Sequence, residues 1–248
     1  MSQLVLITGG SRGIGAATAL LAARQGYAVA VNYSANSLAA DEVVRQIRQA
    51  GGQAMAVQAD VANEAQVLAM FEKIDAKFGR LSALVNNAGV VDQTTRVDAI
   101  SLQRLQRMFE INVFGSFLCA REAVRRMSTR YGGTGGSIVN VSSVAARLGA
   151  PGQYVDYAAA KGAIDTFTIG LSKEVAAEGI RVNAVRPGII ETDIHASGGL
   201  PHRAREMAPQ VPMQRAGTAR EVAESIVWLL GESSSYTTGA LLDVTGGR

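Results

Sequence analysis

Short runs of apolar, β-branched residues alternate with longer helical patterns along most of this 248-residue chain. The runs that predict strands are Leu4–Thr8, Ala28–Tyr33, Ala54–Ala59, Ala83–Asn86, Ser137–Ser142, Arg181–Val185 and Ala240–Val244. The segments that predict helices are Gly13–Gln25, Leu38–Ala50, Glu64–Phe78, Leu102–Thr129, Val155–Glu178 and Ala219–Leu230. Regular alternation implies right-handed crossovers between parallel strands, with helices on both faces of one sheet. The sequence therefore predicts a doubly wound α/β fold with about seven parallel strands.

The connections between these segments are short, and glycines punctuate several of them. No linker separates two parts of the chain, so we expect a single domain over residues 1–248. The exception to the short connections is residues 187–217, an irregular stretch with several prolines and glycines. Long irregular segments in compact domains are usually functional, so we interpret this one as a substrate lid with one or two short helices.

Charge and cysteine content narrow the class of protein. The formal net charge is +3, and 24 Lys and Arg are dispersed among 21 Asp and Glu without a basic stripe, which argues against a nucleic-acid partner. No apolar stretch reaches the length of a membrane span. Cys119 is the single cysteine, and the first strand pattern begins at Leu4 without room for a signal peptide. We therefore expect a cytoplasmic protein that binds neither nucleic acid nor a membrane.

A glycine-rich turn follows the first predicted strand and opens the first predicted helix. It reads Thr8-Gly9-Gly10-Ser11-Arg12-Gly13-Ile14-Gly15. Glycines let the backbone turn tightly and approach a ligand, and the amides at the start of the helix then face a pyrophosphate. The turn predicts a dinucleotide site made by Gly9, Ser11, Arg12, Gly13, Ile14 and Gly15.

The end of the second predicted strand bears on the choice between NAD and NADP. Many NAD enzymes place an Asp or Glu there for the ribose 2′-hydroxyl, but this chain reads Asn32-Tyr33-Ser34. Arg12 can instead contact a 2′-phosphate, with Asn32 and Ser34 as neutral donors. We therefore expect NADP as the cofactor, with NAD as the alternative. The competing interpretation of Arg12 is a solvated loop arginine.

Tyr157 and Lys161 stand four residues apart in a predicted helix, so a phenol and an ammonium share one face. An ammonium roughly 5 Å away, at an effective dielectric of about 20, would stabilise the phenolate by about 3 kcal/mol, or roughly 2 pK units. We therefore expect Lys161 to lower the pKa of Tyr157, which would let the phenol exchange a proton with a substrate oxygen. Taken alone, the pair also fits an ordinary, partly exposed helix face.

With the glycine turn, Asn86-Asn87-Ala88-Gly89 and Tyr157-x-x-x-Lys161 in this order, the whole chain resembles the short-chain dehydrogenase/reductase family. The resemblance implies a Rossmann-type fold, a nicotinamide cofactor and, commonly, a tetramer. It implies that the Asn-Asn-Ala-Gly segment closes the adenine side and stabilises the central sheet, that Asn112 is catalytic, and that Lys161 also holds the nicotinamide ribose. The further cofactor contacts that it implies are Asp60, Val61, Asn87, Ala88, Gly89, Pro187, Gly188, Ile190 and Thr192.

The family's catalytic serine corresponds to Ser143 or Ser142, at the end of the fifth predicted strand. We favour Ser143 because it is followed directly by the next loop. It lies fourteen residues before Tyr157, one more than the family spacing, which implies a one-residue insertion between Arg147 and Val155. Ser142 remains the alternative.

These residues predict an NADP(H)-dependent oxidoreductase that moves a hydride between nicotinamide and a carbonyl or secondary alcohol. Tyr157 would exchange the proton, Ser143 would hydrogen-bond the reacting oxygen, and Asn112 would link Lys161 to solvent through its backbone or a water. No metal is expected, because His195 and His202 lack the neighbours of a zinc site.

Two other functions compete with this prediction. One is a non-catalytic NADP-binding regulator on the same fold. The other is an epimerase or dehydratase of the longer relatives, which is disfavoured because those carry a different glycine spacing and an added substrate domain. The chain is similar to both 3-oxoacyl carrier reductases and sugar dehydrogenases. Apolar and polar residues mix in the predicted lid, which favours a small or medium carbonyl compound: Ile194, Leu200, Met207 and Met213 stand beside His195, His202 and Arg203.

Overall fold

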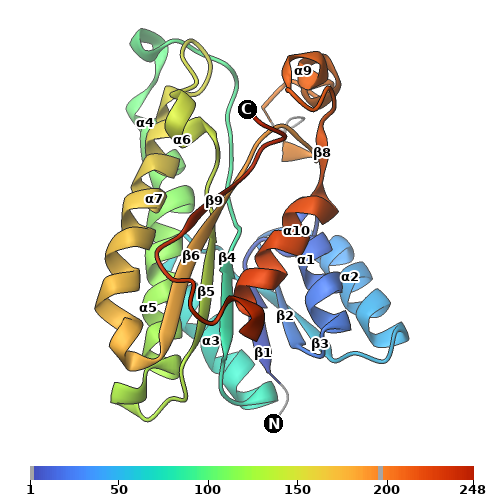
Figure 1. The fold of residues 1–248 in the computed structure, drawn as a ribbon, viewed down its shortest axis with the longest axis vertical. Coiled ribbons are helices and arrows are strands. Elements are labelled where there is room, and N and C mark those ends of the chain that lie inside the picture. Colours follow the sequence, from blue (N-terminus) through green and yellow to red (C-terminus); the bar gives the residue numbers. More distant parts are fainter. Residues whose placement is uncertain (1–2, 195–197) are drawn as a thin grey trace.

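A seven-stranded, wholly parallel sheet forms the centre of the computed structural model, which describes residues 3–194 and 198–248 (Figure 1). The strands are β1 (Leu4–Ile7), β2 (Ala28–Tyr33), β3 (Ala54–Gln58), β4 (Ala83–Asn86), β5 (Gly136–Val141), β6 (Ile180–Pro187) and β9 (Leu241–Val244). Their order across the sheet is β3-β2-β1-β4-β5-β6-β9, so the winding reverses between β1 and β4. The predicted doubly wound α/β fold is confirmed.

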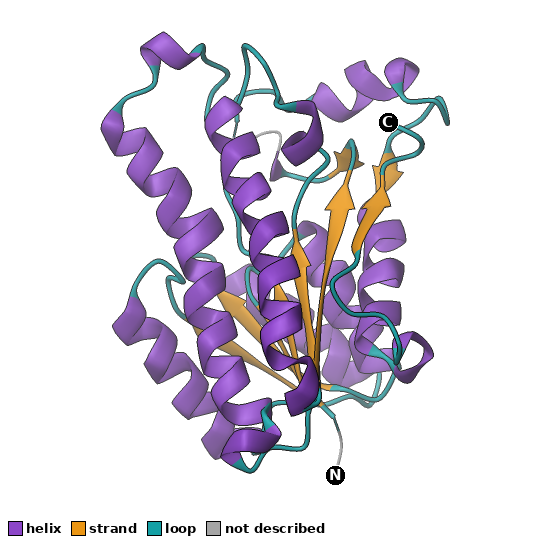
Figure 2. Cartoon of the chain, turned by 60° about the vertical axis from the view of Figure 1, so that its left-hand side comes forward, coloured by secondary structure: helices purple, strands orange, loops and turns teal. Residues whose placement is uncertain are grey.

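Helices cover both faces of the sheet (Figures 1 and 2). On one face lie α1 (Gly13–Arg24), α2 (Ser37–Gln49) and α10 (Ala219–Leu230). On the other lie α3 (Glu64–Phe78), α5 (Gly115–Met127) and α7 (Val155–Val175), with α4 (Leu102–Phe109) against α7. None of the helices in the described ranges is long and apolar enough to span a bilayer.

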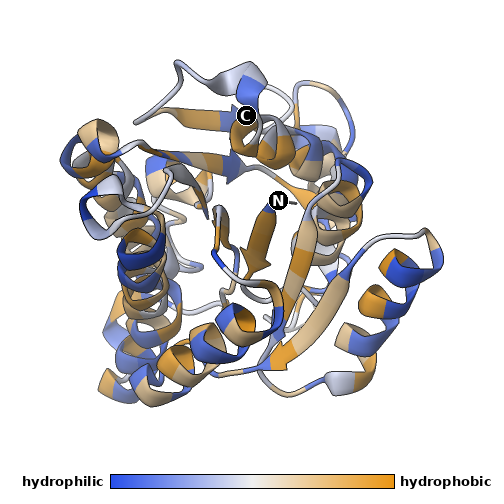
Figure 3. Ribbon diagram, turned by 90° about the horizontal axis from the view of Figure 1, so that it is seen from below, coloured by the Kyte–Doolittle hydropathy of each residue, from blue (hydrophilic) through white to orange (hydrophobic). Residues whose placement is uncertain are grey.

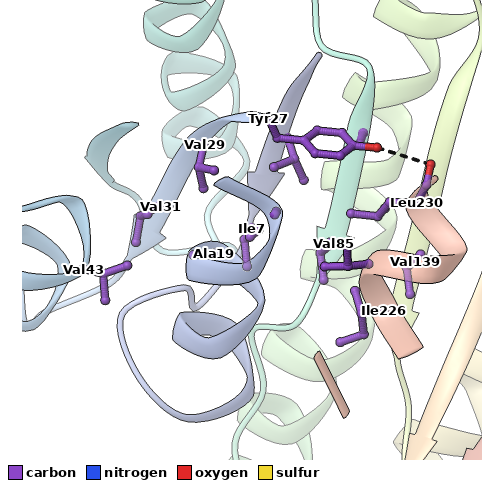
Figure 4. Close-up of a cluster of buried hydrophobic side chains, with 14 of the residues drawn as sticks. Ile7, Ala19, Tyr27, Val29, Val31, Val43, Val85, Val139, Ile226 and Leu230 are labelled. Atoms are coloured by element: carbon purple, nitrogen blue, oxygen red, sulfur yellow. Dashed lines mark hydrogen bonds between the residues drawn. The ribbon is translucent and has the colours of Figure 1, made fainter. Parts of the chain in front are cut away.

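Each face of the sheet has its own apolar core. Figure 4 shows the core under α1 and α10, where Val29, Val85 and Ile226 are fully buried. Tyr27 closes this core, and its hydroxyl donates a hydrogen bond to the Leu230 backbone oxygen at 3.4 Å. Figure 3 colours the ribbon by hydropathy: the strands are largely hydrophobic, and the helices carry both hydrophobic and hydrophilic residues. Because both faces of these strands are covered, the strands read as continuous apolar runs.

The observed elements agree with the predicted ones to within one or two residues, with two differences. The expected helix over Leu102–Thr129 is divided by a π-helical turn at Glu110–Phe114, between α4 and α5. The expected helix over Val155–Glu178 is α7 followed by a 3-10 turn at Ala176–Glu178. A π turn adds one residue to a helical turn without changing the apolar pattern strongly, so hydrophobic periodicity alone does not predict it.

Residues 187–194 and 198–217 lie at the carboxyl edge of the sheet (Figure 1). They include β7 (Ile190–Glu191), which pairs with β8 (Gly217–Thr218), and the short helix α9 (Arg203–Met207) followed by a 3-10 turn (Ala208–Gln210). The segment has a small apolar core formed by Ile189, Ala204, Val211 and Ala216, with Met207 packed against it. Met207 therefore supports this segment from within. His202 is exposed, and His195 lies outside the described residues.

Candidate active site

A cavity of about 180 Å³ lies where the carboxyl ends of the central strands meet residues 187–217. Ligands of open α/β sheets bind at this edge, where the strand order reverses. Ten of the residues predicted from the sequence line the cavity: Ile14, Asn87, Gly89, Ser143, Tyr157, Lys161, Pro187, Gly188, Ile190 and Thr192. Segments far apart in the sequence thus converge on one site.

The glycine turn is tied to the strands on both sides of it. The Gly9 backbone N–H donates to Asn32 Oδ1 at 3.1 Å, and Asn87 Nδ2 donates to the backbone oxygens of Thr8 at 2.9 Å and Gly9 at 3.0 Å. A Cβ on Gly15 would lie 2.4 Å from the Gly9 oxygen and 2.5 Å from Asn87 Nδ2. No other residue fits at Gly15 without moving this framework.

The start of α1 is suited to an anion. No side chain caps this helix and its first turn holds no acidic residue, whereas Asn36, Asn63 and Thr218 cap α2, α3 and α10. Uncapped amides at a helix N-terminus bind phosphate groups. Gly13, with a φ of 54°, faces the segment after β6, because a Cβ there would lie 3.4 Å from Thr192 Cγ2. The turn and the helix start therefore fit a dinucleotide pyrophosphate.

Asn32 does not fit its predicted role as a donor to a 2′-phosphate. Its side chain is buried, and Nδ2 donates to the backbone oxygens of Val57 at 3.3 Å and Ala59 at 3.0 Å. Its Oδ1 accepts from the Gly9 N–H. Both ends of the Asn32 amide are hydrogen-bonded within the protein. Asn32 therefore joins β2, β3 and the glycine turn and has a structural role next to the site.

The other residues predicted for the adenine side and the 2′-phosphate lie in the glycine turn and at the ends of β2, β3 and β4. Those whose side chains are partly or fully exposed are Ser11, Arg12, Tyr33, Ser34 and Asp60. Val61 is buried against α5, since a Cβ on Gly115 would lie 2.7 Å from Val61 Cγ2. The Ala88 N–H donates to Thr8 Oγ1 at 3.0 Å, which fastens the end of β4 to the glycine turn.

Tyr157 and Ser143 both line the cavity, and the Ser143 side chain acts on the Tyr157 phenol to lower its pKa. The Ser143 hydroxyl also accepts from the Ala145 backbone N–H at 3.1 Å. Ser142 is buried, and its hydroxyl donates to Asp165 Oδ1 at 2.7 Å. The Ser142 proton is therefore engaged inside the protein, and the geometry favours Ser143 as the serine that meets a substrate.

Lys161 is buried behind Tyr157, one turn further along α7. Its Nζ donates to the Val141 backbone oxygen at 2.8 Å and lies 5.7 Å from the centre of the Tyr157 ring. Burial lowers the pKa of Lys161 to about 8, an effect that the carboxylate of Asp165 partly opposes. Burial raises the pKa of Tyr157 to about 12, while the hydrogen bond from Ser143 acts in the opposite direction.

The expected lowering of the Tyr157 pKa is therefore wrong for this structure. That expectation considered only the attraction between two charges at an intermediate dielectric. Burial removes water from the phenolate, and this cost exceeds the attraction of a neighbouring ammonium that is bonded to a strand carbonyl. Tyr157 is thus protonated at neutral pH and is suited to donate a proton.

Asn112 is fully buried in the π turn between α4 and α5. Its Nδ2 donates to the backbone oxygens of Val90 and Met108, both at 3.0 Å, and its Oδ1 accepts from the Val90 N–H at 3.2 Å. A Cβ on Gly89 would lie 2.8 Å from Asn112 Oδ1 and 3.5 Å from Lys161 Nζ, so Gly89 separates these two groups. Both the donor and the acceptor of the Asn112 side chain already have hydrogen-bond partners. Any hydrogen-bonded connection to Lys161 would therefore use the Asn112 backbone.

Replacing Ser142 and Ser143 separately should distinguish the catalytic role of one from the structural role of the other. Ser143→Ala removes the hydrogen-bonding partner of Tyr157 and should lower kcat by about 10- to 100-fold with little change in stability. Ser142→Ala leaves Asp165 short of a buried hydrogen bond and should cost about 1–3 kcal/mol of unfolding free energy, with a smaller loss of kcat. Steady-state kinetics and urea unfolding of both variants test this, and the reverse pattern would make Ser142 the functional serine.

Comparison with known proteins assigns this arrangement to a family. A family model described as enoyl-(acyl carrier protein) reductase matches residues 9–248. An uncharacterized oxidoreductase of Escherichia coli K12, YgfF, is 58% identical over 99% of both chains. This chain belongs to the short-chain dehydrogenase/reductase family. A 3-oxoacyl-[acyl-carrier-protein] reductase of Synechocystis is 40% identical, with 99% of this chain and 96% of the relative covered. A solved short-chain dehydrogenase/reductase mutant of Serratia marcescens matches with a TM-score of 0.90 at 32% identity, covering 99% of this chain and 97% of that one.

As a short-chain dehydrogenase/reductase, the protein is an oxidoreductase, and its relatives imply a nicotinamide cofactor.

Sequence reasoning missed two parts of the site. Asp165 accepts from Ser142 and from Arg186 Nε at 2.9 Å and acts electrostatically on Lys161; its position four residues after Lys161 was the available signal. The cavity wall formed by Gln153, Tyr154 and Arg203 had no sequence signal, because its parts are brought together only by folding.

The buried Lys161 should make the stability of this dehydrogenase/reductase depend on pH. The unfolded chain keeps the Lys161 proton up to about pH 10.5 and the folded protein only up to about pH 8. The unfolded state therefore binds more protons between these values, and stability rises with pH across that window. As the pH rises through this window, the unfolding free energy of the wild type should increase by up to about 3 kcal/mol relative to that of Lys161→Met. This follows from a pKa difference of about 2.5 units at about 1.4 kcal/mol each. Urea unfolding of both proteins at several pH values tests this, and a constant difference would contradict it.

Proposed function

We propose that this protein is an NADP(H)-dependent oxidoreductase that interconverts a carbonyl compound and a secondary alcohol. The observation that carries the proposal is that Tyr157 and Ser143 line one cavity beside the glycine turn, with Lys161 buried behind Tyr157. Two hydroxyls that meet at one point can bind a single substrate oxygen. The name of the Synechocystis relative, a 3-oxoacyl reductase, supports a carbonyl substrate.

In the reductive direction, Tyr157 donates its proton to the substrate oxygen while Ser143 stabilises the negative charge that develops there. When bound, the nicotinamide supplies the hydride in reduction and accepts it in oxidation. The raised pKa of Tyr157 permits this step, because an alkoxide is a stronger base than a phenolate. Protonated Lys161 stabilises the phenolate that remains, and the Asn112 backbone connects Lys161 to solvent through water.

We assign the cofactor contacts on the same basis. The amides of the glycine turn and of the α1 start hold the pyrophosphate: Gly9, Ser11, Gly13, Ile14 and Gly15. The adenine side is bounded by Tyr33, Asp60, Val61 and Ala88, and the nicotinamide side by Asn87, Gly89, Tyr157, Lys161, Pro187, Gly188, Ile190 and Thr192. Arg12 and Ser34 are the groups open to a 2′-phosphate.

Arg12 provides the test of cofactor choice. Wild-type enzyme should prefer NADPH to NADH, and Arg12→Ala should raise KM for NADPH by about 10- to 100-fold, the value of a lost charge-assisted contact. KM for NADH should stay within about twofold, because that cofactor has no phosphate for Arg12 to bind. Arg24→Ala, at the exposed other end of α1, is the matched control. A wild-type preference for NADH would overturn the assignment.

Turnover separates the proposed enzyme from a non-catalytic NADP-binding regulator. Consumption of NADPH and NADH should be followed by absorbance over a panel of ketones, acyl thioesters, quinones and sugars. The proposal expects turnover with at least one of these classes. Tight NADPH binding, measured by fluorescence titration, without turnover across the panel would favour the regulator.

We further propose that the protein is a homo-oligomer, with a tetramer suggested by the family resemblance. Several large apolar side chains are exposed on α4, α5, α7 and the π turn: Leu102, Phe114, Phe117 and Ile169. These elements contact one another, and an interface between subunits would cover the apolar side chains exposed on them. Light scattering should give about four times the chain mass of 25.9 kDa, and a monomeric mass would refute the proposal.

A further inference from the structure

The cavity wall has an unusual balance of charge. Among the described residues that line it, three have cationic side chains, Lys161, Arg203 and Arg248, and none is an Asp or Glu. The whole chain has a net charge of only +3, so positive charge is concentrated at this site. A cavity lined by one sign of charge attracts ligands of the other sign.

Arg203 differs in its partners from four other arginines near this edge. Arg104, Arg147, Arg186 and Arg215 each form an ion pair with a carboxylate. Arg203 takes part in none of the ion pairs found within residues 3–194 and 198–248.

Two neutral neighbours hold the Arg203 side chain in place. One Nη donates to Gln153 Oε1 at 2.6 Å, and the guanidinium carbon lies 5.5 Å from the centre of the Tyr154 ring. Stacking on a ring and a bond to a neutral amide orient a guanidinium without cancelling its charge. A guanidinium has five N–H donors, so several remain for a ligand in the cavity.

The location of Arg203 relates it to the reacting groups. Arg203 begins α9 in the lid, and Tyr154 lies three residues before Tyr157 on the same side of the cavity. The guanidinium, the ring on which it stacks and the Tyr157 phenol therefore line one cavity. The wall near them is apolar and includes Val144, Leu148, Ile189 and Ile194.

We propose that Arg203 forms an anion subsite and that the substrate is a keto acid or hydroxy acid, whose carboxylate binds Arg203 while its carbonyl or alcohol oxygen binds Tyr157 and Ser143. A short apolar chain or ring between the two groups would contact the apolar wall. This inference rests on the proposed oxidoreductase function. It adds the substrate class, which neither the glycine turn nor the tyrosine and lysine pair specifies.

Pairs of substrates that differ only in the anionic charge test the proposal. Acetoacetate, levulinate and 4-oxocyclohexanecarboxylate should each be compared with their methyl esters, with NADPH consumption as the readout. Wild-type kcat/KM should favour at least one acid over its ester by tenfold or more. Arg203→Gln should lower kcat/KM for that acid by about 10- to 100-fold and leave the ester within about twofold, because one charge-assisted contact is lost.

Three further variants control the comparison. Arg205→Gln, on the same short helix but exposed to solvent, should keep the wild-type preference for the acid. Arg203→Lys retains the charge without the planar fork and should retain part of the preference. Arg248→Gln tests the second arginine of the wall and should leave most of the preference intact.

Each contrary result has a distinct meaning. Equal losses with acid and ester in Arg203→Gln would show that Arg203 only fastens the lid to Gln153 and Tyr154, and would overturn the subsite. Loss of the preference in Arg248→Gln but not in Arg203→Gln would also overturn it. Wild-type reduction of neutral ketones with no preference for any acid would reject the keto acid class alone. Failure to reduce any carbonyl compound would reject the proposed function itself.

Discussion

Tyr157→Phe should lower kcat by about 10³-fold while leaving the affinity for NADPH nearly unchanged. The substitution removes the proton that the substrate oxygen must receive and leaves the ring in place. General acid catalysis contributes about 10²- to 10⁴-fold in enzymes, and Tyr157 lines the cavity together with Ser143. The fold should persist, since a phenylalanine ring fills nearly the same volume.

Single-turnover and steady-state kinetics measure the loss, and fluorescence titration with NADPH measures binding. Tyr131→Phe is a matched control, because Tyr131 is exposed and lies on a 3-10 turn away from the cavity. It should have wild-type kcat. Near-wild-type turnover of Tyr157→Phe on the best substrate would rule out the proposed proton transfer.

Gly15→Ala should abolish tight cofactor binding and destabilise the protein. The added Cβ would lie 2.4 Å from the Gly9 backbone oxygen, 2.5 Å from Asn87 Nδ2 and 3.0 Å from the Gly10 Cα. Two of these three atoms are backbone, and the Asn87 amide is itself bonded to Thr8 and Gly9. Overpacking of this kind costs about 1–3 kcal/mol or more. We expect about 3 kcal/mol of lost unfolding free energy and at least about 100-fold weaker NADPH binding, which corresponds to roughly 3 kcal/mol.

Gly170→Ala is the matched control for this substitution. Gly170 lies within α7, and a Cβ there meets no atom within 4 Å. Alanine has a higher helix propensity than glycine, so this variant should be as stable as the wild type or more stable by up to about 1 kcal/mol. Urea unfolding and NADPH titration of both variants provide the comparison. Unchanged stability and binding in Gly15→Ala would mean that the glycine turn is less tightly packed than the structure shows.

Some elements of the site could be predicted from local sequence because their geometry is local. Tyr157 and Lys161 share a helix face at a spacing of four residues, and the glycine turn lies between a strand and a helix whose patterns are clear. The strand patterns are clear because both faces of the sheet are buried. The carboxyl ends of parallel strands meet at one edge, so topology alone brings these segments together.

Other properties of the same residues depend on what surrounds them. The pKa of Tyr157 moves opposite to the expectation because desolvation exceeds a single favourable charge. Asn32 turns inward to backbone oxygens of β3, although its sequence position was compatible with a phosphate contact. Ser142 and Ser143 are adjacent in sequence, but one meets Asp165 and the other meets Tyr157.

The sequence by itself determined the fold class, the order of the elements and the main groups that converge on the site, since these follow from hydrophobic period, glycine placement and helix spacing. Only the tertiary structure decided how those groups are solvated, which donors are already occupied, and that Arg203 reaches the cavity wall from α9, far along the chain. The physical reason is that solvation, hydrogen-bond saturation and long-range contact are properties of the packed environment. A residue acquires them only when distant segments exclude water around it.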